Sequence, residues 1–286
     1  MLSILPQVII EGVITGMIIA LVAMGVSLIW GVMYVVNFAQ GELLMVSMFS
    51  TYLFTTYSGL DPLVCLPIVI AFMYLVGATL YQFLIKRVLK APMLTQLLVT
   101  YSLSLVLINT AQIFFTARYK TIVTQRFNSI VRLLGMTISM TRIIPLLICI
   151  GASVIMYIIL NKTNLGRSIK ATALNRTAAS LVGINPEKAY RRCVGLAAAT
   201  AGCAGVAFSY YFYVYPSVGA SFMNLGFVAC CIGGMGSIPG VVLGGLIMGL
   251  IDSFVGAYFN AAFKYMAMFM LYIGVVYYRP KGFFGW

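Results

Sequence analysis

Long apolar stretches, each about the length needed to cross a membrane, recur along this chain. A membrane-spanning helix needs about 20 predominantly apolar residues. Such stretches lie at residues 7–29, 37–57, 63–85, 93–116, 143–161, 191–213, 222–236, 240–258 and 263–278. Glycines interrupt the chain between 222 and 258, so the pattern predicts eight or nine spans in an all-α polytopic membrane protein. The first stretch lacks a basic flank and a small-residue cleavage site, and we expect it to be a retained span.

One polar, basic segment, residues 162–192, interrupts this pattern and has helical spacing of its own. Its apolar residues fall on one face, which predicts an amphipathic helix over 168–182. These residues are Ile169, Ala173, Leu174, Ala178, Leu181 and Val182. Gly166 is placed to end the preceding span, and Gly183 to end the amphipathic helix in the left-handed conformation. Asn185 and Pro186 are typical of the first residues of a new helix that enters the membrane. The amphipathic helix could dock on a partner or lie in the membrane interface.

Composition agrees with a membrane protein. The 286 residues are 62% hydrophobic and 8% charged, with a mean hydropathy of +1.05, whereas soluble domains carry about 25% charged residues. The net charge of +13 does not indicate nucleic-acid binding, because the basic residues lie mainly at the ends of spans. With segment 162–192 in the cytoplasm, twelve Lys and Arg residues lie inside and six outside. This orientation places the N-terminus outside; the main objection is the basic 117–142 loop, which could face an external partner.

Polar residues inside the spans are the candidates for function. Asn37, Gln40 and Glu42 stand where the second span should begin. Either Asn37 caps a helix that starts at the interface, or the three line a pathway or form a hydrogen-bond hub. Asp252 could be functional or could sit near the outer interface. Asn109 and Gln112 are expected to donate hydrogen bonds between helices.

The late glycines predict close helix packing around a break. Gly236, Gly240 and Gly244 form two overlapping G-x-x-x-G steps, a spacing that lets helix backbones approach closely in membranes. Residues 237–239 (Ser-Ile-Pro) should break the helix, with Gly240 in the turn. A broken helix at a substrate path is the alternative. A phosphate-binding loop is excluded, because no Lys-Ser/Thr pair follows the glycines.

No catalytic or metal-binding constellation is visible. The chain has no histidine, its six cysteines form no C-x-x-C pair, and its five acids are dispersed. We therefore expect no metal, no cofactor bound by this chain and no enzymatic activity.

Four stretches, in order, resemble the branched-chain amino acid permeases of bacterial ABC importers, and most of all the leucine/isoleucine/valine permease branch. They are GVMYVVNFAQGELLM, LGRSIKATALNRTAASLVGIN, GGMGSIPGVVLGGLIMGLID and the terminal RPKGFFG. The family often has an acid within the second stretch. This chain has Asn175 and Thr177 there and no acid, a departure that affects which residues would pair with a partner.

The resemblance implies an ABC importer permease fold, with residues 1–286 as a single transmembrane permease domain in the bacterial inner membrane. The implied partners are a second homologous permease chain, two cytoplasmic ATP-binding subunits, an extracytoplasmic amino-acid-binding protein and membrane lipid. Segment 162–192 would contain the coupling helix that fits a groove of the ATPase. Its expected contact residues are Thr172, Asn175, Arg176, Ala178, Ala179, Leu181 and Gly183.

The expected mechanism is alternating access, in which movement of the coupling helix tilts the sixth span. Polar groups of a mostly apolar path would be Asn37, Gln40, Glu42 and Asn224. Three alternatives stay open: an ABC permease for urea, amides or other small polar solutes, a secondary transporter or channel that works alone, and a membrane-embedded enzyme. The last would need a clustered acid–base or metal set, which the sequence does not offer.

Overall fold

A computed structural model describes residues 5–122, 130–133 and 136–285. Each of the nine predicted spans coincides with a helix, which confirms the all-α polytopic fold class. The nine are α1 (Leu5–Met33), α2 (Gln40–Ser58), α3 (Pro62–Leu80), α5 (Met93–Phe115), α6 (Met140–Lys162), α9 (Pro186–Phe208), α10 (Val218–Gly233), α11 (Ile238–Tyr258) and α12 (Phe263–Tyr278). Among the described residues, five helices are by themselves long and apolar enough to cross a membrane: α1, α3 with its extension to Val88, α5, α6 and α11.

Shorter elements connect these helices. A π-helical turn η2 (Tyr81–Ile85) and α4 (Lys86–Val88) extend α3, and α7 (Asn164–Leu174) and α8 (Arg176–Leu181) follow α6. Two strands, β1 (Ile130–Leu133) and β2 (Met136–Ser139), pair antiparallel with Ile130 opposite Ser139. Residues 123–129 and 134–135 of the 117–142 loop fall outside the described residues, so the role of this loop toward an external partner stays a prediction.

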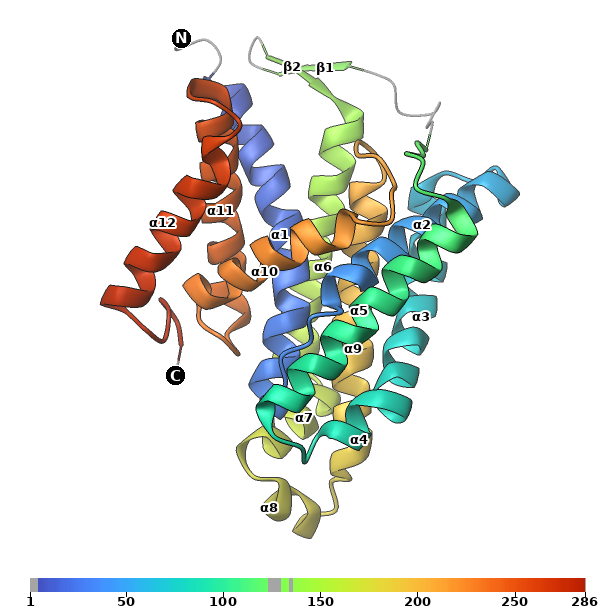
Figure 1. Cartoon of the computed structure of the whole chain (residues 1–286), viewed down its shortest axis with the longest axis vertical. Helices are drawn as coiled ribbons and strands as arrows, with labels where there is room; N and C mark the ends of the chain where they lie inside the picture. Colours follow the sequence, from blue (N-terminus) through green and yellow to red (C-terminus); the bar gives the residue numbers. More distant parts are fainter. Residues whose placement is uncertain (1–4, 123–129, 134–135, 286) are drawn as a thin grey trace.

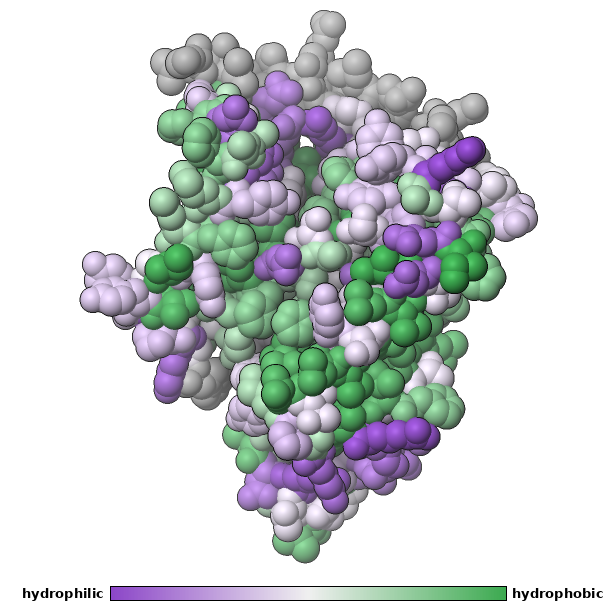
Figure 2. All heavy atoms as spheres, in the orientation of Figure 1, coloured by the Kyte–Doolittle hydropathy of each residue, from purple (hydrophilic) through white to green (hydrophobic). Residues whose placement is uncertain are grey.

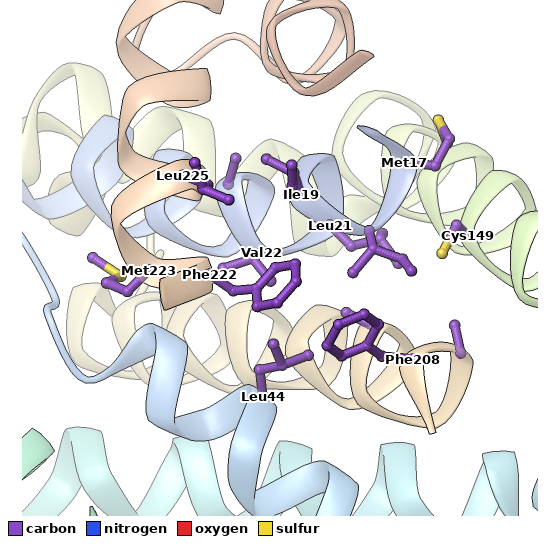
Figure 3. Close-up of a cluster of buried hydrophobic side chains, with 14 of the residues drawn as sticks. Met17, Ile19, Leu21, Val22, Leu44, Cys149, Phe208, Phe222, Met223 and Leu225 are labelled. Atoms are coloured by element: carbon purple, nitrogen blue, oxygen red, sulfur yellow. The ribbon is translucent and has the colours of Figure 1, made fainter. Parts of the chain in front are cut away.

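Helix α1 lies in the core of the molecule and packs against α6, α9, α10 and α11 (Figure 1). Its residues from Met17 to Ile29 are almost entirely buried. Figure 3 shows where α1, α2, α9 and α10 meet: Val22, Leu44, Phe208 and Phe222 point into one shared apolar cluster. Helix α10 crosses in front of α1 in Figure 1 rather than running beside it.

Glycines bring α11 into backbone contact with two neighbours. On the α1 side, a Cβ atom at Gly249 would lie 2.2 Å from the backbone nitrogen of Gly16. On the α10 side, a Cβ at Gly244 would lie 2.2 Å from the carbonyl oxygen of Ala229. Only glycine permits helix axes to come this close, as the G-x-x-x-G spacing predicted.

The predicted break before α11 is present, but its glycines have different roles from those expected. Gly236 is not part of a helix, because it lies in the turn with φ +89°, as does Gly234 with φ +102°. It still packs closely on α1, where a Cβ at Gly31 would lie 2.8 Å from the Cα of Gly236. Gly240 is not the turn residue: it lies inside α11, where a Cβ would meet the carbonyl oxygen of Gly233 at 2.2 Å. The Ser237 side chain accepts from the backbone N–H of Gly240 and so caps the new helix, which fixes the turn two residues earlier than predicted.

The surface has the distribution of polarity expected for a membrane protein. Hydrophobic residues form a band over the middle of the molecule, and hydrophilic residues gather near the end that carries α7 and α8 (Figure 2). In α5 many of the outward side chains are apolar and exposed, among them Leu98, Val106 and Ile113. Exposed apolar side chains of this kind face lipid or other membrane helices.

Candidate functional site

The chain between α1 and α2 is extended rather than helical and is mostly buried. Tyr34, with φ +54°, turns the chain at the end of α1, and the next residues return toward the start of α2 (Figure 1). Non-helical backbone at membrane depth must have its polar groups satisfied by protein. Here the Thr100 hydroxyl of α5 donates to the carbonyl oxygen of Val36 at 3.1 Å. The start of α2 is therefore enclosed by other helices and is not an exposed interfacial end.

The predicted polar residues Asn37 and Gln40 hold this start in place. The Asn37 side chain does not cap the helix directly, because its oxygen accepts the backbone N–H of Ala39, which is the N-cap residue. The Gln40 side-chain amide donates to the carbonyl oxygen of Ala197 in α9 at 2.8 Å. It also fills the space beside Gly25 of α1, where a Cβ would lie 1.9 Å from its nitrogen. Both residues are buried and tie helices together in this structure.

Glu42 is the most unusual polar residue in the membrane region. It is only 1% exposed. One carboxylate oxygen accepts a hydrogen bond from the Ser104 hydroxyl of α5 at 3.2 Å, and the other has no hydrogen-bond partner. Within the described part of the chain, no Lys or Arg forms an ion pair with it. Placing an acid in the centre of a membrane costs about 2.5–3.5 kcal/mol on insertion scales, which makes an unpaired acid a candidate for function.

The other four acids all have partners. Glu11 pairs with Arg142, Glu187 with Lys86 at 2.8 Å, and Asp252 with Lys264 at 3.1 Å. Asp61 caps α3 by accepting the backbone N–H of Leu63, and it also accepts the Tyr210 hydroxyl. The ion pair with Lys264 gives Asp252 a structural role in joining α11 to α12, which favours the second of the two readings of this residue.

The unpaired oxygen of Glu42 faces the first turn of α10. A Cβ at Gly219 would lie 2.5 Å from this oxygen and 2.4 Å from the carbonyl oxygen of Gly41. The first turns of α2 and α10 therefore touch through two glycines. The side chain of Ser217, at the N-cap position of α10, makes no capping hydrogen bond. Asn224, the last predicted path residue, lies on α10 and is exposed.

Helix α5 supplies polar residues to this region that the sequence reasoning missed. Gln96, Thr100 and Ser104 follow one another at intervals of four and form the buried stripe of α5. This i, i+4 spacing of polar residues within an apolar span was the signal that could have identified them. Asn109 is not an interhelical donor as predicted: it is exposed and donates to Leu105 of its own helix. Gln112 is exposed as well.

The polar segment 162–192 forms two short helices instead of one. Thr163 caps α7, so that Gly166 lies inside this helix and does not end the preceding span. At Gly166 a Cβ would meet the carbonyl oxygen of Leu160 at 2.3 Å, so the reversal from α6 to α7 requires glycine. Asn175 then ends α7 and starts α8, because its side chain accepts the backbone N–H of Ala178 at 3.0 Å. Side-chain competition of this kind breaks a helix although the apolar spacing continues.

The corner between α8 and α9 is as the sequence predicted. Gly183 has φ +83°, and the N–H of Ile184 donates to the carbonyl oxygen of Ala179 at 3.0 Å, as in a Schellman motif. The Asn185 side chain accepts the backbone N–H of Lys188 at 3.1 Å and caps α9, with Pro186 in the first turn. Capping on both sides makes this corner a defined structure rather than a loose loop.

Two contacts fix this corner against the membrane helices. Ile169 of α7 is buried in an apolar cluster with α1, α6 and α9. The Arg176 guanidinium lies 5.9 Å from the centre of the Tyr190 ring of α9, within the range of a cation–π contact. Displacement of α8 would therefore be passed to α9.

The predicted contact residues of this segment divide into two groups. Thr172 and Ala179 are buried, at 2% and 3% exposure, so they face this chain itself. Asn175, Arg176, Ala178, Leu181 and Gly183 are exposed. Three apolar side chains at the tip are exposed far more than usual: Leu174 at 89%, Leu181 at 83% and Val182 at 76%. Apolar groups at this level of exposure mark a candidate contact surface, either for a partner or for the membrane interface.

Comparison with known proteins identifies the family. The profile of the family described as the permease component of the branched-chain amino acid transport system matches residues 8–276. The chain belongs to this family. It is thus the permease subunit of a transport system and a multi-pass membrane protein, which confirms the resemblance found in the sequence.

Individual relatives match the permease over nearly its whole length. The high-affinity branched-chain amino acid transport system permease protein BraD of Pseudomonas aeruginosa is 28% identical, over 98% of this chain and 95% of the relative. LivH of Escherichia coli K12, of the same description, is 27% identical over 96% and 94%. The probable branched-chain amino acid transport permease protein LivH of Methanocaldococcus jannaschii is 28% identical over 90% and 83%. No solved structure matches the permease significantly.

Proposed function

We propose that this permease translocates branched-chain amino acids as the membrane-spanning subunit of an ATP-driven importer in the bacterial inner membrane. The observation that carries the proposal is the family match over residues 8–276. Relatives named as branched-chain amino acid transport permeases match almost the entire chain as well. The predominantly apolar interior suits aliphatic side chains, and the few buried polar groups suit the zwitterionic part of the substrate.

The proposed assembly contains a second homologous permease chain, two cytoplasmic ATP-binding subunits and an extracytoplasmic amino-acid-binding protein. The chain itself contains no G-x-x-x-x-G-K-[ST] sequence, the phosphate-binding loop of many ATPases. ATP hydrolysis is therefore assigned to the partner subunits, and this chain binds no cofactor. The exposed apolar sides of α5 and α12 are available for lipid and for the second permease.

The coupling segment of this assembly is α7–α8. Its tip exposes Leu174, Leu181 and Val182, next to Arg176 and Ala178, and these side chains would enter a groove of the ATPase. Movement of the ATPase would be passed through the Gly183 corner to α9. Because Ala179 and Thr172 are buried, they support the shape of the segment and do not themselves touch the ATPase.

Uptake measurements test the substrate. We expect cells that carry the complete transporter to accumulate labelled leucine, isoleucine and valine in competition with each other, and excess urea not to compete. ATP depletion with the ion gradient maintained should abolish uptake. Uptake that follows the ion gradient and survives ATP depletion would instead establish a secondary transporter, and competition by urea or amides would move the substrate to that class.

A charge at the exposed tip tests the coupling role. We expect Leu181→Asp to reduce uptake strongly at unchanged permease abundance, because it places a charge in an apolar contact. The matched control is Asn161→Asp, which adds the same charge on the same side of the membrane, away from the tip, and keeps an oxygen for Lys170. Equal uptake by both variants would contradict docking through α8. Ala179 is unsuitable for this test, since a larger side chain there would unseat α8.

A further inference from the structure

We propose that Glu42 binds the α-ammonium group of the transported amino acid, at a site that opens where the first turn of α10 separates from the first turn of α2. This inference rests on the proposed function and assigns to one residue of the buried polar cluster a direct role toward the substrate. It distinguishes Glu42 from Asn37 and Gln40, whose side chains form hydrogen bonds with other groups of this chain.

Glu42 carries a buried carboxyl group that this chain does not fully satisfy. This carboxylate is 1% exposed, it accepts only the neutral Ser104 hydroxyl, and its second oxygen has no partner. An ionisable residue in a membrane span normally pairs with an opposite charge or lines a substrate path. Among the described residues no ion pair reaches Glu42, so this carboxyl group can take a cation supplied by a bound ligand.

Backbone atoms of α10 lie in front of the unpaired oxygen of Glu42. It points at Gly219, where even a methyl group would be 2.5 Å away, so the wall here consists of backbone alone. The side chain of Ser217 does not cap α10, which leaves its first N–H groups without a side-chain acceptor. The N-terminus of a helix attracts anions.

Together these groups match the chemistry of a free amino acid. An α-amino acid carries its ammonium and carboxylate groups on one carbon atom, and Glu42 and the uncapped start of α10 offer an anion and an anion-binding terminus side by side. The neighbouring surface is apolar: Met223 lies against Gly41, and the Phe38 and Phe227 rings stack with centroids 6.4 Å apart. An aliphatic side chain of the bound amino acid fits these apolar surroundings, whereas a charged side chain does not.

Helices α2 and α10 can part at this point. The first turns touch through Gly41 and Gly219, with the Met223 side chain against Gly41 and the Glu42 side chain against Gly219. In the described part of the chain, no hydrogen bond joins α2 to α10. Separation here costs mainly van der Waals contact and exposes the carboxylate, so the structure represents the site in its closed state.

The test uses the complete transporter and compares Glu42→Gln with Glu42→Asp. The amide keeps the shape of the side chain and the bond from Ser104 but removes the charge, whereas aspartate keeps the charge. We expect leucine uptake per permease molecule in the membrane to fall at least about tenfold in Glu42→Gln, the effect of a charge-assisted hydrogen bond, with ATP hydrolysis still present. Glu42→Asp should restore a substantial part of uptake. The matched control, Asp252→Asn, neutralises a membrane acid away from this site and should leave uptake per molecule unchanged.

Each result decides the proposal. Uptake per molecule that is unchanged in Glu42→Gln overturns it, and so does a Glu42→Asp variant that is as inactive as Glu42→Gln, because that pattern indicates packing rather than charge. An equal loss in Asp252→Asn also overturns it. Leucine uptake by the wild type is measured in the same experiment. Absence of wild-type uptake would refute the proposed function, whereas wild-type uptake with an unaffected Glu42→Gln variant would refute only the role of Glu42.

Discussion

The contact between α1 and α11 offers a direct test of how closely these helices approach. At Gly249, an added Cβ would lie 2.2 Å from the backbone nitrogen of Gly16 and 2.3 Å from the carbonyl oxygen of Gly12. Both atoms belong to the backbone of α1, so no side chain can rotate away. Replacement of Gly249 by alanine must therefore push the two helices apart or distort one of them.

The size of the effect follows from this geometry. Ordinary van der Waals contacts of a Cβ begin at 3.4 Å, so the alanine methyl group is about 1.2 Å too close. Overpacking of this kind costs about 1–3 kcal/mol, and a backbone obstacle places it at the upper end. Alanine recovers up to about 1 kcal/mol through its higher helix propensity. We expect Gly249→Ala to lower the free energy of unfolding by about 2 kcal/mol.

The assay is unfolding of the purified permease in detergent, by heat and by denaturant. The matched control is Gly151→Ala in α6, where an added Cβ meets nothing within 4 Å. We expect the control to be as stable as the wild type or slightly more stable. If Gly249→Ala proved as stable as Gly151→Ala, the backbone contact between α1 and α11 would be refuted.

Three further predictions concern the ends of helices. Gly183→Val should lower stability by about 1–2 kcal/mol, because its φ of +83° disfavours a side chain; thermal unfolding measures this, and an unchanged midpoint would contradict the left-handed corner. Phe283→Pro removes the N–H that donates to the carbonyl oxygen of Ile232 at 2.9 Å, so stability should fall by about 1 kcal/mol; no loss would show that the tail does not hold α10. The hydrogen bond from Lys86 lowers the pKa of Glu187 below its ordinary 4.5, so this tie is present above pH 4.5 and is lost as the pH falls through the lowered pKa. Amide exchange at the start of α9 should rise in acid, and Lys86→Met should abolish that rise; a rise of the same size in the variant would exclude the ion pair as its cause.

The helices and the corner after α8 could be predicted because their signals are local. A span is a matter of length and apolar content, and all nine stretches became helices. Gly183, Asn185 and Pro186 were predicted correctly because each has a backbone preference that acts within a few residues. The G-x-x-x-G spacing likewise indicated that α11 packs closely.

The inward faces could not be predicted in the same way. In a soluble protein apolar residues mark the core, but in a membrane they face lipid as well, so apolar periodicity does not show which side is buried. For this reason the inward stripe of α5 with Thr100 and Ser104 was missed, and the outward Asn109 was taken for an interhelical donor. The burial of Ala179 depends on how α8 seats on α9, which a helical pattern alone does not contain. The break at Asn175 is local, because its side chain accepts the backbone N–H of Ala178, but it competes with an apolar spacing that continues through it.

The two candidate regions are connected through α9. Its N-terminal end is fixed to α8 by the capped corner, and its middle is tied to α2 by Gln40 to Ala197 and by Ser47 to Gly202, both at 2.8 Å. The C-terminal end of α10 is held separately, by the tail through the N–H groups of Phe283 and Phe284, and the turn that follows α10 is held on α1 through Gly236 and Ser27. A tilt of α9 would therefore move the start of α2 relative to α10, where the Glu42 carboxylate is closed off.

Contacts alone do not demonstrate coupling, but a double-mutant cycle measures it. If α9 transmits the movement, Leu181→Asp and Gln40→Leu interrupt the same route, and the second substitution should add little to the loss of uptake caused by the first. Independent routes would instead give losses that multiply, as expected for sites that act separately. If the losses of uptake in the two single variants multiply in the double variant, α9 only supports the fold. Separation of α2 from α10 would then need a cause other than movement transmitted from the ATPase.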